Sequence, residues 1–319
     1  MAVPPYISAD FINQNTVYKE LVEELRKGFA SNQIITPDRH HHDFPNSTTG
    51  QDSTMLLMPS WQDGEDAGVK VVTVSPDNSR YDLPSIQGSY IYLNAITGQV
   101  KAIIDAKSLT SKRTAAASAL ASSYLSLPES SSLLVLGTGA LSSELIAAHV
   151  SMRPLTKVWV WGRNFQKAEK VCQLERSDKV DVMAVKAIED SIDKVDIVSA
   201  ATMSSVPLIK GSWLKQGQHI DLVGSFKPHM READDEAIRR SEIYADVRHM
   251  AIKESGDLQM PISRGIINEN DIKADLFELC SSQKKGREDE NSITLFKSVG
   301  HALEDLIAAR YYYQKFVNV

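Results

Sequence analysis

Two glycines, Gly137 and Gly139, follow a run of apolar residues at 133–136 and precede an apolar-periodic segment. Strand, Gly-x-Gly and helix in that order form the context that a dinucleotide-binding loop requires. Gly137 permits a tight turn, Gly139 lets the backbone approach a pyrophosphate, and Ser142 supplies a small residue near the third position. The following helix N-terminus favours an anion. This stretch predicts a bound dinucleotide, against the alternative of a tight turn that binds nothing.

Arg163 and Asn164 come after the next apolar run, 157–161, where the ribose of such a cofactor should lie. An acidic residue there would take the 2′-hydroxyl of NAD, whereas an arginine can pair with the 2′-phosphate of NADP. We therefore predict NADPH as the cofactor, with NADH as the alternative. The competing interpretation of Arg163 is a solvated arginine in a turn.

Two positively charged residues, Lys70 and Arg113, occupy positions where a cation is expected to destabilise the local structure. Lys70 interrupts the apolar run 67–74, and a lysine there is costly unless its ammonium reaches an anion or a wet cavity. An edge lysine that extends to solvent is the alternative. Arg113 lies in the expected first turn of an Ala-rich helix capped by Thr110, where a cation opposes the helix dipole but completes an anion site. Both residues are candidate ligands for a substrate anion.

The three adjacent histidines at 40–42 suggest a metal site at first sight. Consecutive side chains on an extended segment point to opposite faces, and the i, i+4 pairing and carboxylate partner of zinc motifs are missing. The two cysteines, Cys172 and Cys280, lack metal-ligand spacing and predict reduced thiols. We expect no metal.

Composition excludes several classes of protein. The 319 residues carry a formal net charge of −6 with 42% hydrophobic residues, which argues against a nucleic-acid partner. No apolar run approaches the roughly 20 residues that cross a bilayer, and the N-terminus lacks a basic region followed by an apolar one. We expect a cytoplasmic protein that does not bind membranes.

The elements that must position these residues change character along the chain. The first hundred residues are strand-rich and include an expected hairpin of 89–94 with 100–105. From 133 to about 243 strands and helices alternate, which predicts a parallel sheet covered on both faces. Loops at 201–203 and 224–228 follow strand ends and are candidate ligand loops. A last helix is expected over 293–312, with Leu295, Val299, Leu303 and Leu306 on one stripe.

Several of these segments together resemble the ornithine cyclodeaminase/mu-crystallin family. The resemblance runs from about residue 37 to 312 and rests on Gly68-Val69-Lys70, Arg113-Thr114-Ala115-Ala116, the loop at 137–140, Val223-Gly224-Ser225 followed by Arg231-Glu232, and 294–300 followed by Glu304-Asp305. It implies an α/β fold in which a Rossmann-type, doubly wound parallel sheet is inserted into a strand-rich α+β domain for substrate binding and dimerisation. The expected domains are 1–117 plus 296–319 for substrate and dimerisation, and 118–295 for the dinucleotide.

The resemblance also implies site residues. Arg39, Lys70, Arg113 and Val299 match positions that bind substrate, and the guanidinium forks of the two arginines suit a carboxylate. Cofactor contacts carry over to Ser85, Arg113, Ala140, Leu141, Thr202 and Ser298. Thr202 and Ser298 have plain alternatives as a strand-end cap and a helix-face hydroxyl. A homodimer is implied as well.

Phe226 bears on which reaction the chain performs. Members with ornithine cyclodeaminase activity have an acid/base aspartate at this position, and a phenyl ring cannot relay a proton. The segments 39–42, 57–61 and 224–228 instead resemble the branch that reduces the cyclic ketimines Δ1-pyrroline-2-carboxylate and Δ1-piperideine-2-carboxylate to L-proline and L-pipecolate. Hydride from the nicotinamide would add to C2, with Lys70 as the first candidate for the proton donor and a histidine of 40–42 as the second.

Other functions on the same scaffold stay open at this point. They are dehydrogenation or reductive amination of an open-chain amino acid, lyase activity on ornithine, and non-catalytic binding of NADPH and a small ligand, as in mu-crystallin-like proteins. Ring size is also open, because one methylene in a pocket changes binding by only about 1–3 kcal/mol.

Overall fold

The chain divides into two units, each built on its own sheet, in a computed structural model that describes residues 3–318. Unit 1 runs to Thr114 and resumes at His301, and unit 2 is Ala115–Gly300. Unit 2 is therefore inserted into unit 1 along the sequence. The expected boundaries at 117/118 and 295/296 fall inside a helix and a strand, and the assignment of independent domains stays a prediction.

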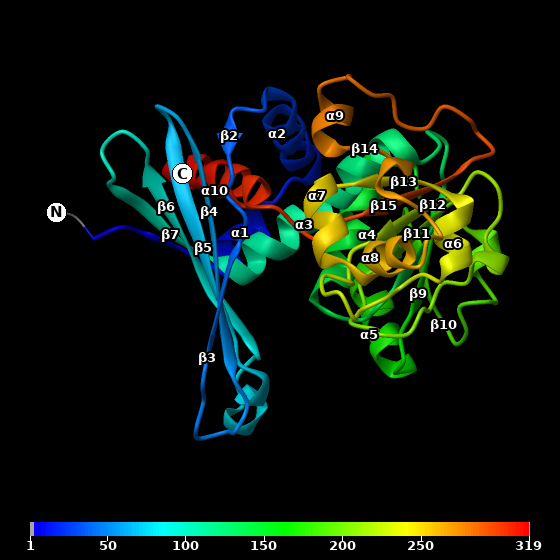
Figure 1. The fold of residues 1–319 in the computed structure, drawn as a ribbon, viewed down its shortest axis with the longest axis horizontal. Coiled ribbons are helices and arrows are strands. Elements are labelled where there is room, and N and C mark those ends of the chain that lie inside the picture. Colours follow the sequence, from blue (N-terminus) through cyan, green and yellow to red (C-terminus); the bar gives the residue numbers. More distant parts are fainter. Residues whose placement is uncertain (1–2, 319) are drawn as a thin grey trace. The chain divides into compact units, whose positions relative to one another are not determined.

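Unit 1 contains a mostly antiparallel sheet with helices packed on one face. Its elements are β1 (Tyr6–Ile7), α1 (Ala9–Asn15), α2 (Tyr18–Ser31), β2 (Ile34–Ile35), β3 (His40–Phe44), β4 (Ser53–Gln62), β5 (Asp66–Val74), η1 (Pro76–Tyr81), β6 (Ile86–Asn94), β7 (Val100–Asp105), the start of α3 (Ala106–Leu125) and α10 (Ala302–Val317). The strand order is β1-β7-β6-β5-β4-β2, with β3 also paired to β4. The predicted hairpin is β6 and β7. The red helix α10 packs against β4, β5, β6 and α2 (Figure 1).

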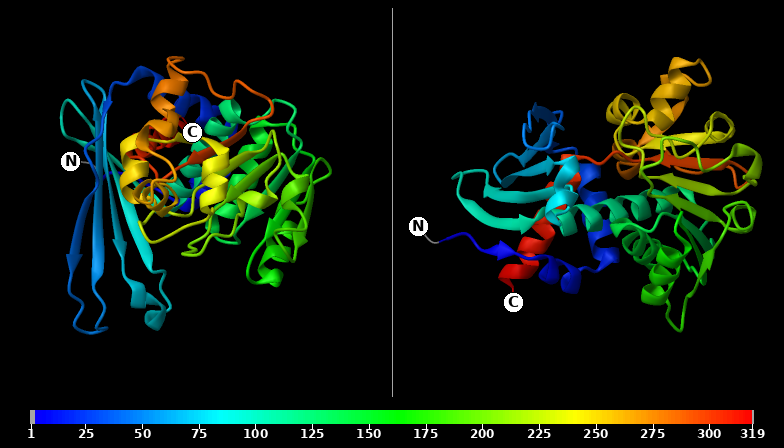
Figure 2. Two further views of the ribbon diagram at one scale, coloured as in Figure 1. Left: turned by 45° about the vertical axis from the view of Figure 1, so that its right-hand side comes forward. Right: turned by 90° about the horizontal axis from the view of Figure 1, so that it is seen from below.

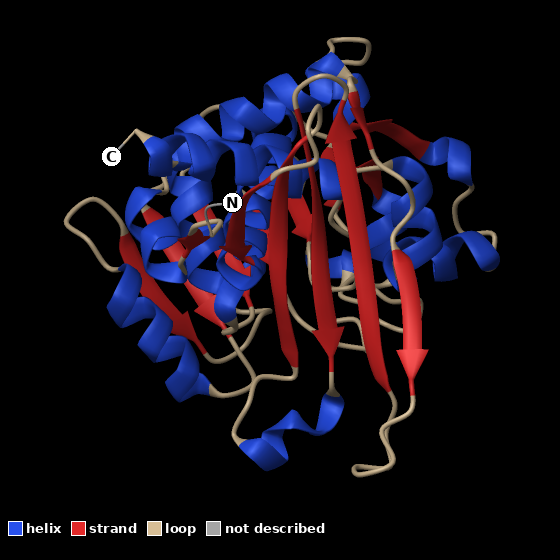
Figure 3. Cartoon of the chain, turned by 90° about the vertical axis from the view of Figure 1, so that its left-hand side faces the viewer, coloured by secondary structure: helices blue, strands red, loops and turns tan. Residues whose placement is uncertain are grey.

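The two faces of this sheet differ. Residues on the face toward α10 are buried, among them Met58, Lys70 and Tyr90, which are paired in register across β4, β5 and β6. The intervening residues, such as Val69 and Ile91, are only half-buried. In Figure 3 the longest strands lie in front of the helices, so this second face is not covered by a helix.

Unit 2 is the predicted parallel sheet with helices on both faces, which confirms the fold class. Its elements are β8 (Ser132–Leu136), α4 (Ala140–Met152), β9 (Lys157–Trp161), α5 (Phe165–Glu175), β10 (Asp181–Val185), η2 (Ile192–Lys194), β11 (Ile197–Ala200), η3 (Gly211–Trp213), β12 (His219–Leu222), α6 (Asp235–Arg240), β13 (Ser241–Ala245), α7 (Arg248–Glu254), α8 (Gly256–Ser263), η4 (Glu269–Asp271), β14 (Ile272–Asp275), α9 (Leu276–Cys280) and β15 (Ile293–Lys297). The order is β10-β9-β8-β11-β12-β15-β13-β14, and every pairing in it is parallel.

The apolar run at 133–136 explains the position of β8 inside unit 2. Leu133 and Val135 pack into one core with Ile146, whereas Leu134 and Leu136 pack into a second core. Because successive residues of a strand point to opposite faces, a continuous apolar run suits a strand covered on both sides. Figure 2 shows the helices of unit 2 on both sides of its sheet.

The expected helix over 293–312 is wrong at its start. Ile293–Lys297 is β15, which pairs with β12 and β13 in the middle of the sheet, and the helix α10 begins only at Ala302. Gly300 between them has φ +81°, a left-handed conformation that ends regular structure. A short apolar run is compatible with a buried strand and with part of a helix face, so the sequence pattern alone did not distinguish the two.

The expected start of the Ala-rich helix is also wrong. Helix α3 begins at Ala106, and the Asp105 carboxylate accepts a hydrogen bond from the Ser108 N–H at 2.8 Å. Asp105 therefore caps the helix in place of Thr110. Arg113 lies well inside α3, so the N–H groups of a first turn do not contribute to an anion site at Arg113, and its binding of a substrate anion stays a prediction.

Candidate functional site

The glycine loop after β8 has the geometry of a pyrophosphate cradle. Gly137 has φ +128°, and a Cβ at this position would lie 2.7 Å from the Ala201 carbonyl oxygen. Gly139 is the N-cap of α4, has no side-chain cap, and faces open space where its Cβ would be. Ala140 and Leu141 open the helix. Since free N–H groups at a helix N-terminus bind phosphate, these residues fit the dinucleotide that the motif predicts.

The neighbouring strand brings the candidate ribose residues to the same loop. The Gly137 N–H donates to the Trp161 carbonyl at 2.9 Å, and a Cβ on Gly162 would lie 2.5 Å from Thr138 Cγ2. Arg163 follows and is exposed. The Asn164 Oδ1 caps α5 by accepting from the Lys167 N–H at 3.1 Å. Asn164 thus has a structural role, and contact of either residue with a cofactor stays a prediction.

The two candidate substrate cations meet in unit 1 on a pair of buried acids. We call Lys70, Arg113, Glu304 and Asp305 the anchored cation cluster. The Lys70 Nζ lies 2.9 and 2.7 Å from the two oxygens of Asp305, and the Arg113 Nε lies 2.9 Å from Asp305 Oδ1. The Arg113 Nη1 lies 2.7 Å from Glu304 Oε2. All four side chains are buried.

The elements of unit 1 explain why this cluster forms. Lys70 projects from β5 toward α10, Arg113 comes from α3, and both acids lie in the first turn of α10. Carboxylates in a first turn are favoured by the helix dipole. The helix start is held in place by Ser60, whose hydroxyl donates to the Ala302 carbonyl at 2.9 Å.

Electrostatics in the anchored cation cluster favour charged Arg113 and an easily deprotonated Lys70. Burial lowers the pKa of Lys70 to about 8; Asp305 opposes the fall, and the positive charges of Arg113 and Arg39 add to it. Burial acts to raise the pKa of Asp305, but Arg113 and Lys70 outweigh it and lower the pKa. Burial also works against charge on Arg113, but Asp305 and Glu304 outweigh it and raise the pKa of Arg113. Lys70 can therefore give up a proton near neutral pH, as an acid catalyst must.

Arg39 immediately precedes β3, is half-buried, and acts electrostatically on Lys70. Whether Arg39 joins Lys70 and Arg113 in binding a substrate stays a prediction. His40 and His42 share a face of β3 with their ring centroids 6.2 Å apart, as the alternation of a strand requires. Within residues 3–318, no three His, Cys, Asp or Glu side chains gather as a metal site would need.

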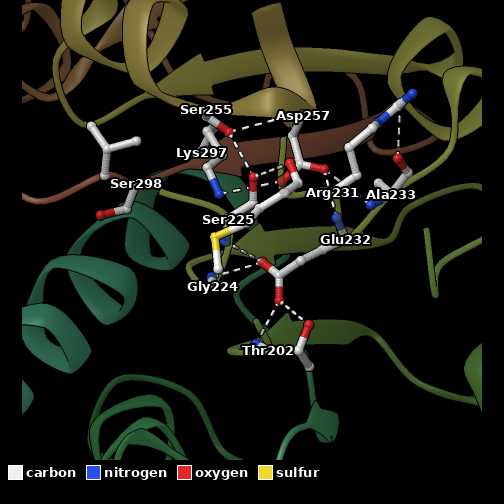
Figure 4. Close-up of polar contacts among 12 residues, drawn as sticks. Thr202, Gly224, Ser225, Arg231, Glu232, Ala233, Ser255, Asp257, Lys297 and Ser298 are labelled. Carbon is white, nitrogen blue, oxygen red and sulfur yellow. Dashed lines mark hydrogen bonds and ion pairs between the residues drawn. The ribbon is translucent and has the colours of Figure 1, made fainter. Parts of the chain in front are cut away.

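In unit 2, a buried carboxylate joins the two candidate ligand loops. Glu232 Oε1 accepts from the Thr202 N–H at 2.7 Å and from the Thr202 hydroxyl at 2.9 Å. Glu232 Oε2 accepts from the N–H groups of Gly224 at 2.7 Å and Ser225 at 3.3 Å. Figure 4 shows Thr202 and Gly224 on two sides of this carboxylate. The loops after β11 and β12 are therefore tied together, and we call this arrangement the Glu232 clamp.

Further charges surround the Glu232 clamp. The Asp257 Oδ1 accepts from the N–H groups of Glu232 at 2.8 Å and Ala233 at 3.1 Å, and its Oδ2 lies 3.3 Å from the Lys297 Nζ (Figure 4). Burial raises the pKa of Glu232 to about 7; Lys297 opposes the rise and Asp257 adds to it. Thr202 is half-buried, whereas the carboxylate behind it is fully buried.

The remaining predicted residues have different surroundings. The Ser298 hydroxyl donates to Asp246 Oδ2 at 3.1 Å, and the Val299 N–H donates to the same oxygen at 2.8 Å. Both residues are buried in the turn after β15. Ser85 is exposed between η1 and β6 and lies outside the anchored cation cluster. Roles for Ser85, Ser298 and Val299 stay predictions.

Sequence reasoning missed the acids behind these sites. Glu304, Asp305 and Glu232 belong to segments that carried the family resemblance, but no role was inferred for them. A usable signal was present for two of them: Glu304 and Asp305 directly follow the apolar Leu303 and precede Leu306. Acids on the apolar face of a helix imply buried partners, because an unpaired buried charge is costly.

Comparison with known proteins identifies the family. The profile of the ornithine cyclodeaminase/mu-crystallin family matches residues 7–319. The chain is 33% identical to Delta(1)-pyrroline-2-carboxylate reductase of Paracoccus denitrificans, over 97% of this chain and 96% of that protein. It is 37% identical to Protein SAR DEFICIENT 4 of Arabidopsis thaliana, over 99% of each.

A solved structure is also similar over nearly its whole length. Delta(1)-pyrroline-2-carboxylate reductase of Thermococcus litoralis, in complex with NADH and L-proline, superposes with a TM-score of 0.91 at 31% identity and covers 98% of both chains. Fold, glycine loop and family profile point the same way. The chain belongs to the ornithine cyclodeaminase/mu-crystallin family.

Proposed function

We propose that this protein reduces the C=N bond of a cyclic ketimine carboxylate with a reduced nicotinamide dinucleotide. The substrates are Δ1-pyrroline-2-carboxylate, Δ1-piperideine-2-carboxylate or both, and the products are L-proline and L-pipecolate. The observation that carries the proposal is the anchored cation cluster, in which buried Lys70 and Arg113 are held on Asp305. The relatives named Delta(1)-pyrroline-2-carboxylate reductase, one of them solved with NADH and L-proline, support this reaction.

The residues of the cluster divide the work of binding and protonation. Arg113 and Arg39 present guanidinium groups suited to a carboxylate, and the ammonium of Lys70 adds a third positive charge. Lys70, with its pKa lowered to about 8 by burial, donates a proton to the imine nitrogen. The resulting iminium accepts hydride more readily than a neutral imine. When bound, a reduced nicotinamide supplies that hydride to C2.

Unit 2 supports the choice of cofactor. The glycine loop at Gly137 and Gly139 fits a pyrophosphate, and Arg163 extends from the loop after β9. We propose NADPH as the preferred donor because an arginine at this point can pair with the 2′-phosphate. Thr202, Ser298, Ala140, Leu141, Asn164 and Ser85 are proposed cofactor contacts, and Val299 a substrate contact.

We also propose a homodimer formed through the uncovered face of the unit 1 sheet. Leu57, Val71, Val69 and Ile91 are neighbours in register on this face and are only half-buried. A contiguous apolar sheet face of this kind marks a protein contact. Val71→Glu should yield monomer in size-exclusion chromatography with light scattering, whereas an unchanged dimer would place the interface elsewhere.

A cytoplasmic location is proposed because Cys172 and Cys280 form no disulfide. The part of the chain that the structure describes has no helix with the length and apolar character to span a membrane.

The test of the reaction is a steady-state assay of NADPH and NADH oxidation with each imine. We expect turnover with at least one cyclic imine and formation of the L-amino acid. Pyruvate with ammonia and L-ornithine serve as controls for reductive amination and for lyase activity. Turnover of a control substrate without turnover of either imine would contradict the proposal.

A further inference from the structure

The Thr202 hydroxyl has its only proton committed to a buried carboxylate. Its Oγ1 donates to Glu232 Oε1 at 2.9 Å, and the same oxygen of Glu232 accepts the Thr202 N–H at 2.7 Å. Above its pKa of about 7, Glu232 is ionised and only accepts hydrogen bonds, so in that pH range the Thr202 hydroxyl is the donor of this bond. A hydroxyl that already donates its proton can still accept a hydrogen bond through its lone pairs. It can therefore bind a ligand only as an acceptor.

The position of Thr202 in the sheet selects the part of the cofactor that can reach it. In a doubly wound sheet the dinucleotide lies across the carboxyl ends of the strands, with its halves on either side of the switch point. The glycine loop follows β8, and β9 with Arg163 lies on one side of it. Thr202 follows β11 on the other side, and Gly224 follows β12 next to it. The adenosine half belongs to the β9 side, so Thr202 belongs to the nicotinamide half.

The packing around the Glu232 clamp leaves little freedom for Thr202 to turn away. A Cβ on Gly224 would lie 1.9 Å from the Thr202 carbonyl oxygen and 2.5 Å from Glu232 Oε1. Glu232 itself is fully buried and is held by the bond from its N–H to Asp257. Thr202 is half-buried, so part of this residue stays accessible beside the buried clamp.

We infer that Glu232 is a positioning residue that presents the Thr202 hydroxyl as a hydrogen-bond acceptor for the carboxamide N–H of a bound nicotinamide. The inference rests on the proposed binding of a nicotinamide dinucleotide and adds how the ring is oriented. In a nicotinamide the carboxamide is the ring substituent that carries N–H donors. Fixing it fixes which face of the ring is turned to the substrate, and a hydride can leave only from that face.

The experiment measures equilibrium binding and needs no imine. The purified full-length protein is titrated at pH 8, above the pKa of about 7 that burial gives Glu232, with NAD⁺, 3-acetylpyridine adenine dinucleotide and ADP-ribose. The acetylpyridine analogue has a methyl group in place of the carboxamide NH₂. ADP-ribose keeps the ribose hydroxyls but lacks the nicotinamide ring. We expect the wild type to bind NAD⁺ about tenfold more tightly than the analogue, as the loss of one hydrogen bond would give.

Three variants isolate the contact. Thr202→Val should remove the preference for NAD⁺ over the analogue and leave the Kd of ADP-ribose unchanged, whereas Thr202→Ser should keep the preference. In Glu232→Gln one of the two accepting oxygens becomes an NH₂ group, which must face either Thr202 or the N–H groups of Gly224 and Ser225. One set of hydrogen bonds is then lost. We expect NAD⁺ binding to weaken about fivefold or more, with the Kd of ADP-ribose unchanged.

Several results would overturn the inference. A wild type without preference for NAD⁺, or a Thr202→Val variant that retains it, shows that the hydroxyl does not read the carboxamide. Equal weakening of NAD⁺ and ADP-ribose in Thr202→Val assigns the hydroxyl to the ribose, and equal weakening in Glu232→Gln makes Glu232 merely structural. Wild-type protein that binds NAD⁺ with the expected preference but turns over neither imine would contradict the proposed reaction and leave this inference standing.

Discussion

The two units each bury a group of charged residues, but they use them in opposite ways. In the anchored cation cluster, acids on α10 stand behind Lys70 and Arg113 and hold two cations in place. In the Glu232 clamp, the acid binds backbone N–H groups and one hydroxyl of two loops. The first arrangement holds two cations, which we propose bind the substrate anion, and the second holds the shape of two loops.

The difference follows from what each partner can do after it is paired. A guanidinium or ammonium has several N–H donors, so a cation held by one carboxylate can still bind another. A backbone N–H has a single donor, which the carboxylate consumes. Unit 1 thus keeps binding capacity in its charged side chains, whereas unit 2 keeps it in the glycine loop and in the lone pairs of Thr202. Substitutions in the two groups should therefore fail in different ways.

Lys70→Met should have the largest effect, because it removes both a positive charge and the proposed proton donor from the cluster. We expect kcat/KM for the imine to fall about a thousandfold, the scale of a lost general acid. The Kd of NADPH, measured by fluorescence titration, should stay close to the wild-type value.

The control is Lys107→Met, which removes the same charge from an exposed position at the start of α3. It should retain full activity. An active Lys70→Met variant would exclude Lys70 from the mechanism.

Asp305→Asn should come next, because it leaves buried Lys70 and Arg113 with one ionic partner fewer. Breaking a buried pair costs about 3–5 kcal/mol of unfolding free energy, measurable by urea denaturation. The pH profile gives a sharper test. Protonated Lys70 is required, so kcat/KM should fall above about pH 8, the pKa of Lys70. Asp305 raises that pKa, so its loss should move the alkaline limb to lower pH.

Asp190→Asn removes an exposed acid and is the matched control for Asp305→Asn. Neither its stability nor its pH profile should change. If the Asp305→Asn variant has lower activity but the alkaline limb of its kcat/KM pH profile stays at the wild-type pH, Asp305 does not act through Lys70.

Gly224→Ala should have a smaller effect, confined to unit 2. The added Cβ would lie 1.9 Å from the Thr202 carbonyl oxygen, so the Glu232 clamp must shift. We expect a loss of about 1–3 kcal/mol in unfolding free energy, as for overpacking elsewhere, together with weaker NAD⁺ binding.

Thermal unfolding with and without NAD⁺ measures both effects of Gly224→Ala. Gln166→Ala on the exposed surface of α5 should change neither. Full stability and affinity in Gly224→Ala would show that the loops are not tightly held.

Arg163→Asp should have the smallest effect, because Arg163 is exposed and its contact is a single charged pair. The ratio of kcat/KM for NADPH to that for NADH should fall about tenfold or more, since the aspartate repels a 2′-phosphate and can accept from a 2′-hydroxyl. Lys167→Asp makes the same charge change nearby and should leave the ratio unchanged. An unaltered ratio in Arg163→Asp would mean that another group reads the phosphate.

Much of the fold could be predicted from local pattern. The apolar run of β8 followed by Gly137 predicted a strand, a turn and a helix, because each preference is set within a few residues. The same holds for the β6 and β7 hairpin. The pattern was ambiguous at Ile293–Lys297, where a five-residue apolar run fits a strand or a helix face. Its place between β12 and β13, remote in sequence, made it a strand.

The sequence by itself singled out Lys70, because a lysine inside an apolar strand is costly unless its ammonium reaches an anion or water. It also singled out Arg113, although the expected place in a first turn was wrong. It also determined the glycine loop, because a left-handed turn needs glycine at Gly137. Only the tertiary structure decided who the partners are: Asp305 is far from Lys70 along the chain, and Glu232 binds loops that follow two different strands. Buried charges are paired by tertiary contacts between residues that are far apart in the sequence. Local sequence preferences therefore do not specify which carboxylate pairs with a given cation.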